Sequence, residues 1–150
     1  MEIDPSKANA LFKTRFDTIS QAMFAPHFSS KYPDYPVFPV KIQEGTRGQN
    51  AQSAIEILCE VGMVTNNGQA VLTALGLYKD GAITPDQSPW LGKIRERMKA
   101  LGPGQYINNS ELFEQMDDKW WFKGERIEAE WLLVVLAAGI RDGDLHVFGK

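Results

Sequence analysis

The stretch that decides the fold is residues 127–141, which read Ile-Glu-Ala-Glu-Trp-Leu-Leu-Val-Val-Leu-Ala-Ala-Gly-Ile-Arg. Apolar residues occupy nearly every side of a helix over this stretch, and a helix that is hydrophobic all round is buried. Glu130 and Arg141 bound the apolar run, which is far shorter than the ~20 residues that span a bilayer. The stretch therefore predicts a helix in the middle of a globular core, ending near Asp142-Gly143.

Three amphipathic helices are predicted on the N-terminal side of this core helix. Apolar residues recur every three or four positions over residues 46–61, 69–79 and 88–101, which is the period of one helix face. Asn66-Asn67-Gly68 is a turn signal between the first two of these helices. Ser88-Pro89 is a helix-start signal, and Gly102-Pro103-Gly104 ends the third helix. The chain is therefore expected to be mainly α, with a minor β content.

The second half of the sequence has the element order of a winged helix. After the helix 88–101 we expect a short strand at 105–107, a short helix at 109–116, the core helix, and a strand at 144–148. Trp120 to Gly124 is expected to form a turn or a short strand. Because a terminal strand needs a partner, it pairs either with residues 105–107 or with a continuation of the chain, and we expect a fragment of a larger protein.

The N-terminal third is expected to be separate from the helical body. Residues 1–45 should contain a helix over 5–25, ended by Pro26, and then an extended connector rich in proline and aromatic residues. Aromatic residues are rare in disordered linkers, so we expect the connector to pack across the body. The body itself is expected to span residues 46–150, with the winged-helix-like part at about 88–150.

Composition excludes several classes of protein. The chain has 150 residues and a formal net charge of −3, which argues against a generally basic nucleic-acid binder. Its single cysteine, Cys59, excludes an internal disulfide framework and a multi-cysteine zinc site. The N-terminus lacks the basic start and apolar run of a signal peptide. These features favour the cytoplasm as the compartment, and no membrane partner is expected.

No catalytic, cofactor-binding or metal-ligating set can be assembled from the sequence, and we expect no cofactor. Residues 62–68 have the glycine spacing of a phosphate loop, but Gln69 stands where the phosphate-binding lysine belongs. The remaining nucleophile or base candidates are His27, His146 and Cys59, and Cys59 is expected to be buried on the apolar face of its helix. A small enzyme using His27 or His146 with a nearby acid remains an alternative hypothesis.

Two groups of residues are candidates for contacts with other molecules. The helix 88–101 carries a basic row that could meet nucleic-acid phosphates, or could simply be the polar side of an amphipathic helix: Lys93, Arg95, Arg97 and Lys99. The core helix cannot read DNA in the winged-helix manner, because it is apolar and begins with acids. The dense aromatic run Trp120, Trp121 and Phe122 either packs in the core or marks a partner surface.

The sequence from Trp131 to Leu145 resembles a segment of the very large P-loop ATPases of phage-growth-limitation and BREX-type bacterial defence systems. Three shorter upstream pieces fall in a similar order in that family: Val71–Leu77, Ser88–Leu91 and Gly104–Leu112. The Pro/Tyr stretch 32–40 also resembles it. The nucleotide-binding motifs of that family are missing here. The resemblance therefore implies an internal or C-terminal module of a multidomain protein, with any ATPase activity residing elsewhere.

Three functional hypotheses follow. The leading one is a non-catalytic interaction module that contacts a partner protein or other domains of its parent chain. The alternatives are a DNA-binding winged helix that uses the basic row, and a small enzyme of unknown class.

Overall fold

The computed structural model describes the backbone of residues 5–148 and the side chains of 13–148 apart from 17 and 21. The chain divides into two compact units, Met1–Tyr35 and Pro36–Lys150. We call the second unit the body. The sequence placed the boundary between its two regions after residue 45, so the second half of the proline-rich connector belongs to the body.

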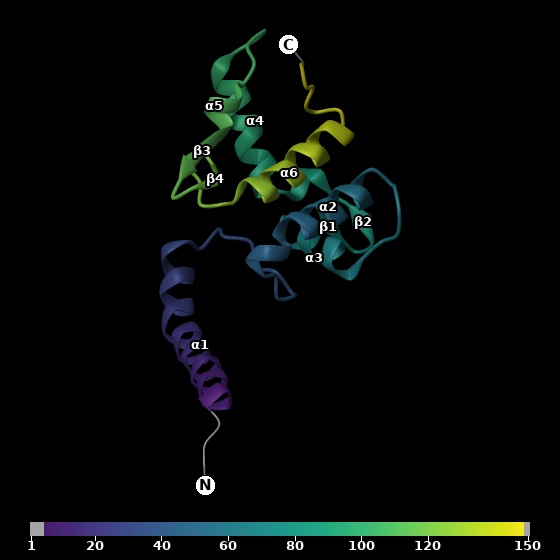
Figure 1. The fold of residues 1–150 in the computed structure, drawn as a ribbon. Helices are drawn as coiled ribbons and strands as arrows, with labels where there is room; N and C mark the ends of the chain where they lie inside the picture. The colour runs from purple at the N-terminus through teal and green to yellow at the C-terminus, as the bar shows by residue number, and fades with distance from the viewer. Residues whose placement is uncertain (1–4, 149–150) are drawn as a thin grey trace. The chain divides into compact units, whose positions relative to one another are not determined.

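The first unit is one long helix, α1 (Pro5–Lys31), which has Pro26 inside it (Figure 1). The expectation that Pro26 ends the helix was wrong. Proline has a helical φ and lacks only one hydrogen-bond donor, so it weakens a helix without always ending it. The helix stops where the ring of Phe28 packs against those of Tyr32 and Tyr35, at centroid distances of 5.0 and 5.2 Å. The apolar side chains of Phe16 and Met23 are exposed.

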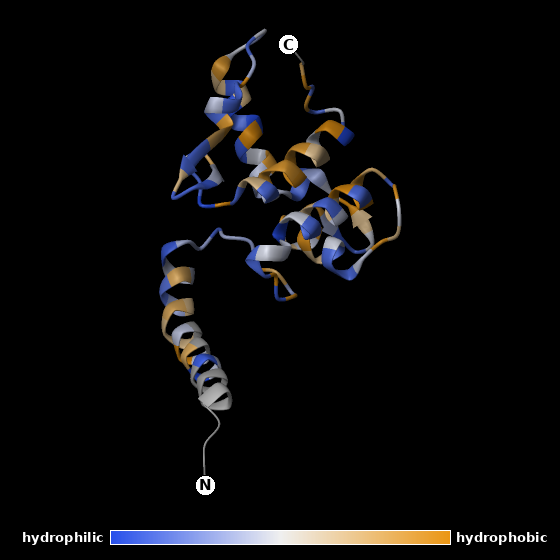
Figure 2. Ribbon diagram, viewed as in Figure 1, coloured by the Kyte–Doolittle hydropathy of each residue, from blue (hydrophilic) through white to orange (hydrophobic). Residues whose placement is uncertain are grey.

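Four helices make the core of the body: α2 (Arg47–Leu58), α3 (Asn66–Ala74), α4 (Pro89–Leu101) and α6 (Ala129–Arg141). Helix α6 packs against α2 and α4, and it forms one of the most hydrophobic stretches of the ribbon (Figure 2). Five side chains among its thirteen residues are almost completely buried: Trp131, Leu132, Val134, Val135 and Ala138. The prediction of a central buried helix is confirmed, as is the mainly α class with minor β structure.

Helix α3 begins and ends earlier than its apolar pattern predicted. Thr65 caps it by accepting a hydrogen bond from the backbone N–H of Gly68 at 3.1 Å, so the expected Asn-Asn-Gly turn is instead the first turn of the helix. At Gly68 the backbone of α3 approaches Ser53 of α2 so closely that an added Cβ would lie 2.8 Å from its carbonyl oxygen.

A hairpin of two short strands, β1 (Tyr78–Lys79) and β2 (Ala82–Ile83), follows α3. The sequence had placed these residues at a helix end and in a loop. Asp80 and Gly81 form the turn with positive φ angles of 51° and 84°, the geometry of a two-residue hairpin. Thus a helix–turn–helix followed by a hairpin does occur, but over residues 47–83.

A second hairpin, β3 (Phe113–Met116) with β4 (Lys119–Phe122), lies between the one-turn helix α5 (Asn109–Leu112) and α6. The helix expected over 109–116 therefore ends after one turn. Of the turn or short strand expected over Trp120 to Gly124, the strand forms as far as Phe122. Asp117 and Asp118 both have positive φ and make the turn. No strand forms at 105–107 or 144–148, so the element order expected of a winged helix over 88–150 is wrong.

The chain after α6 folds back as a helix cap. The backbone N–H of Asp144 donates to the Gly139 carbonyl at 3.0 Å and that of Gly143 to the Ile140 carbonyl at 3.1 Å. With Gly143 at a φ of 82°, this is a Schellman cap. Leu145 is buried, so these residues gain more from capping α6 and covering the core than from an extended strand.

The second half of the connector, which belongs to the body, packs against the core of the body. The ring of Phe38 lies 4.9 Å from that of Trp131, measured between centroids, and Ile42 also contacts the core. Within the described residues no helix combines the length and apolarity that a membrane crossing requires.

Candidate functional site

The basic row of α4 is held by contacts within the body. Lys93 forms an ion pair with Glu125, at 2.6 Å between Nζ and Oε2, and its ammonium lies 4.8 Å from the ring centroid of Trp90. Arg95 pairs with Asp86 at 2.9 Å and with Asp144. The pKa of the Arg95 guanidinium is raised, mainly because of its hydrogen bond to Asp144. Both charges are therefore matched by carboxylates of the same unit.

Arg97 braces the β3–β4 hairpin. Its guanidinium donates to the backbone carbonyls of Lys123 at 2.6 Å and Glu111 at 3.3 Å, and it lies 4.2 Å from the ring centroid of Phe122. Lys99, in contrast, is exposed and forms no ion pair with any residue in the described part of the chain. Of the predicted nucleic-acid contacts, three serve as internal braces.

Replacing Arg97 with alanine should therefore destabilise the body. We expect a loss of about 1–2 kcal/mol in the free energy of unfolding, because charged hydrogen bonds and a cation–π contact are removed together. The matched change Lys99→Ala should alter the free energy of unfolding by less than about 0.5 kcal/mol, as surface substitutions usually do. Urea unfolding followed by circular dichroism measures both. Equal effects of the two variants would show that Arg97 is not a brace.

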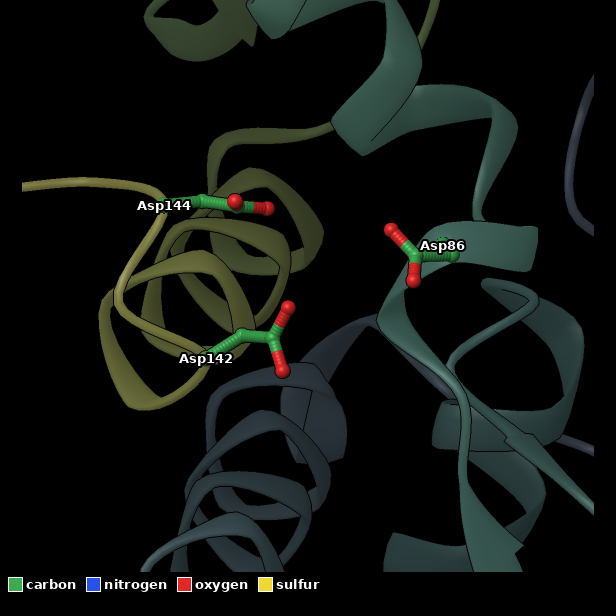
Figure 3. A group of neighbouring side chains, drawn as sticks. All are labelled: Asp86, Asp142 and Asp144. Atoms are coloured by element: carbon green, nitrogen blue, oxygen red, sulfur yellow. The ribbon is translucent and has the colours of Figure 1, made fainter.

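Three carboxylates meet where the end of α6 lies beside the 3-10 turn Pro85–Gln87. The side chains of Asp86, Asp142 and Asp144 point toward a common space (Figure 3), with ligand atoms within 4.8 Å of one another. All are exposed, and Arg95 contacts Asp86 and Asp144. The guanidinium thus places a positive charge beside two of the three carboxylates.

The candidate nucleophile and bases do not form a site within either unit. His27 lies on α1, while His146 and Cys59 belong to the body, and all three are exposed. The expectation that Cys59 is buried was wrong. It is the C-cap residue of α2, where the helix ends and its apolar face no longer meets a neighbour, so the side chain faces solvent.

The aromatic run is divided between core and surface. Phe122 is fully buried with 0% of its surface exposed, whereas Trp120 is 54% exposed and Trp121 is intermediate. Phe113 opposes Phe122 and Gln115 opposes Trp120 in the hairpin register. Since opposite residues, and residues two apart, share one face of a hairpin, Trp120 lies on the same face as Phe122, beyond the point where the core covers it.

An open groove of about 590 Å³ runs along this exposed end of the hairpin. Most of its lining surface is apolar, although half of the lining residues have polar groups. The lining comes from α5, both strands and the first two turns of α6: Asn109, Ser110, Phe113, Glu114, Gln115, Trp120, Ala129 and Leu133. Leu133 is 50% exposed although it belongs to the most apolar helix of the chain. The sequence pointed to Trp120, but it gave no sign that α6 leaves part of its surface uncovered there.

The hairpin is also tied to the start of the body by an ion pair. Nζ of Lys119 lies 2.5 Å from Oε1 of Glu44, in the turn η1 (Glu44–Thr46) before α2. The hydrogen bond with Lys119, followed by its charge, lowers the pKa of Glu44 below the ordinary value of 4.5.

The Glu44 carboxyl should therefore titrate below the ordinary glutamate range, and Lys119→Met should return its pKa to that range. The pair stabilises the fold above the ordinary glutamate pKa, and this contribution is lost as the pH falls through the lowered pKa of Glu44. Carboxyl-detected NMR titration of the parent chain and the variant measures the shift. An unchanged Glu44 titration in the variant would contradict the pairing.

A family model described as "Family of unknown function (DUF6079) 4th domain" matches residues 47–148. The chain belongs to this DUF6079 fourth-domain family. The matched range contains α2 to α6, and with them the groove, the basic row and the three aspartates. The search of curated proteins found no match, and neither did the search of solved structures. The geometry of the body is therefore the main guide to what the DUF6079 fourth domain does.

Proposed function

We propose that the body is a non-catalytic interaction module and that the groove beside Trp120 is its contact surface. The observation that carries the proposal is the position of Trp120, half exposed on the hairpin face whose other end, at Phe122, is buried. An exposed aromatic at the rim of an apolar depression is typical of the anchor positions in protein interfaces. The half-exposed Leu133 extends the same surface onto α6.

The partner we propose is another domain of the parent protein. The family description counts this domain as the fourth, which supports an arrangement of at least four domains in a DUF6079 protein. Contacts between domains of one chain resemble transient protein interfaces and are modest in size. A groove with one tryptophan anchor suits such an interface better than a large permanent one.

Binding to the preceding domains tests the proposal. The 150-residue chain is titrated with domains 1–3 of a DUF6079 protein, produced as a separate polypeptide, and binding is measured by calorimetry. Trp120→Ala should weaken binding by roughly tenfold or more, as the loss of an anchor does. The matched control is Tyr106→Ala, which removes another exposed aromatic outside the groove, and it should leave the affinity unchanged. Equal effects of the two variants would reject the groove as the contact surface.

DNA binding is the alternative, and the braced basic row counts against it. Lys93, Arg95 and Arg97 already have carboxylate or carbonyl partners, so duplex binding would have to break these contacts or rely on Lys99 alone. Fluorescence anisotropy with a labelled duplex at low and physiological salt distinguishes the two functions. Binding that weakens steeply with salt would favour the DNA alternative, and absence of binding at low salt would remove it.

We also infer that the parent protein is a large P-loop ATPase of the bacterial defence type, in which this module acts in the cytoplasm. The support is the sequence resemblance carried by Trp131–Leu145 and the pieces upstream of it. An intact DUF6079 protein should then hydrolyse ATP, and the 150-residue chain alone should not. A coupled phosphate-release assay on both proteins measures this, and nucleotide turnover by the isolated chain would contradict the non-catalytic role.

A further inference from the structure

We propose that the occupant of the groove is a cationic amphipathic helix, with apolar side chains that insert beside Trp120 and Leu133 and Lys or Arg side chains that meet the tip of the β3–β4 hairpin. This inference rests on the proposed function and specifies the chemistry of the partner. It follows from the shape of the groove, from the hydrogen bonds of the hairpin and from the charge around them.

The groove suits side chains presented by a helix. It spans the hairpin face and the first two turns of α6, and its apolar lining offers Phe113, Trp120 and Leu133. A volume of about 590 Å³ has room for several aliphatic side chains. An amphipathic helix fills such a groove with residues at positions i, i+3, i+4 and i+7, and its own backbone is already hydrogen-bonded.

An added β-strand would find few backbone groups to bond. The outer edge of β4 is occupied, because the N–H of Phe122 donates to the Ile127 carbonyl at 2.8 Å and Trp121 bridges to Glu128. On the outer edge of β3 the N–H of Phe113 already donates to the Asn109 carbonyl. Since strand addition gains its affinity from main-chain hydrogen bonds, the geometry favours a helix.

The hairpin tip beside the groove carries uncompensated negative charge. The segment 109–133 holds seven acidic residues and three basic ones. Three of these acids, Glu125, Glu128 and Glu130, are paired with basic residues outside the segment. Two of the three bases in the segment are engaged within the body, because Lys119 pairs with Glu44 and the ammonium of Lys123 donates to the Ser110 carbonyl. The acids at the hairpin tip, Asp117 and Asp118, are exposed and form no ion pair with any residue whose side chain the structure describes.

This charge selects a basic partner over a second copy of the chain. Two grooves that faced each other with their hairpin tips together would bring the aspartates close, at the cost of like-charge repulsion. With the tips at opposite ends, the groove lining of a second copy would offer the aspartates no basic partner. A helix with Lys or Arg at the edge of its apolar face would instead place opposite charges beside Asp117 and Asp118.

The test uses two synthetic helical peptides of about 18 residues with the same leucine positions, one with lysines flanking the leucine face and one with glutamates. Binding to the intact 150-residue chain is measured by fluorescence anisotropy. The lysine peptide should bind at least about fivefold more tightly than the glutamate peptide at low salt, and its advantage should shrink at about 0.3 M salt. Trp120→Ala should weaken the binding of the lysine peptide by roughly tenfold.

Variants locate the charge effect at the hairpin tip. Asp117→Asn with Asp118→Asn should remove most of the lysine preference, and asparagine tolerates the positive φ of both positions. The matched control, Asp80→Asn with Glu96→Gln, makes the same change of charge at exposed residues outside the groove, and should keep the preference. Equal binding of the two peptides, or a preference that survives the Asp117/Asp118 change, would overturn the inference.

Other outcomes separate this inference from the proposed function. If domains 1–3 bind through Trp120 while the two peptides bind equally, the cationic helix is wrong and the interaction module stands. If neither the domains nor the peptides bind, both the interaction module and the cationic helix are wrong. Sedimentation equilibrium could also show that the unmutated 150-residue chain forms a dimer and that Trp120→Ala dissociates it. This result would identify a second copy as the occupant and would overturn the cationic helix.

Discussion

Replacing Phe122 with alanine is expected to lower the free energy of unfolding by about 3–5 kcal/mol, the usual cost of emptying a buried phenylalanine site. Its side chain is fully buried within the core cluster and also receives the guanidinium of Arg97 on its ring. Trp120→Ala, two residues away on the same strand, should cost about 1 kcal/mol or less, because over half of that side chain is already in water.

Urea unfolding of the two variants measures this difference. A small loss for Phe122→Ala together with a large loss for Trp120→Ala would contradict the burial of Phe122 and the exposure of Trp120. The groove would then no longer be a surface feature.

Gly68→Ala is expected to destabilise the body by about 1–3 kcal/mol, the range for overpacking. A Cβ at this position would lie 2.8 Å from the carbonyl oxygen of Ser53 and 2.9 Å from Cδ1 of Ile57. The first of these atoms is backbone and cannot rotate away, so α2 and α3 would have to separate.

Gly48→Ala is the matched control, because Gly48 lies in α2 with no atom within 4 Å of an added Cβ. There alanine should stabilise the helix by up to about 1 kcal/mol through its better helix propensity. Thermal unfolding followed by circular dichroism measures the change in stability of each variant, and the two changes should have opposite signs. A stabilised Gly68→Ala variant would contradict the close approach of the two helices.

Much of the helical body could be predicted from local sequence. The buried helix α6 follows from an apolar stretch without a polar side, and α4 begins as Ser88-Pro89 predicts, with the Ser88 hydroxyl accepting from the backbone N–H of Leu91 at 3.4 Å. Periodicity and caps are properties of a few neighbouring residues, so they can be read without knowing the fold.

The errors arise where several local signals compete. Thr65 caps α3 and turns the Asn-Asn-Gly signal into a helix start. Asn108 and Glu111 form a capping box, but the helix they begin ends after one turn because the next residues pair as a hairpin. The apparent strand at 144–148 alternates like a strand, yet Gly143 and the packing of Leu145 make it a helix cap.

The candidate surface could be predicted only in part. Sequence identified the aromatic run but could not assign its members, because Trp120 and Phe122 share one face of the hairpin and differ only in how far the core covers that face. It identified the basic row but not its carboxylate and carbonyl partners, which lie up to 49 residues away in the chain. The exposure of Leu133 depends on how far the hairpin covers α6, and nothing local encodes that.

Hydroxyl-radical footprinting with mass spectrometry tests the central claim most directly. The 150-residue chain is oxidised alone and in the presence of domains 1–3 of a DUF6079 protein, and the oxidation of each residue is compared. The account predicts protection of Trp120 and Leu133 on binding, with the exposed Tyr106 and the buried Phe122 unchanged. Binding that leaves Trp120 and Leu133 as reactive as in the free chain would contradict the claim that the groove is the contact surface.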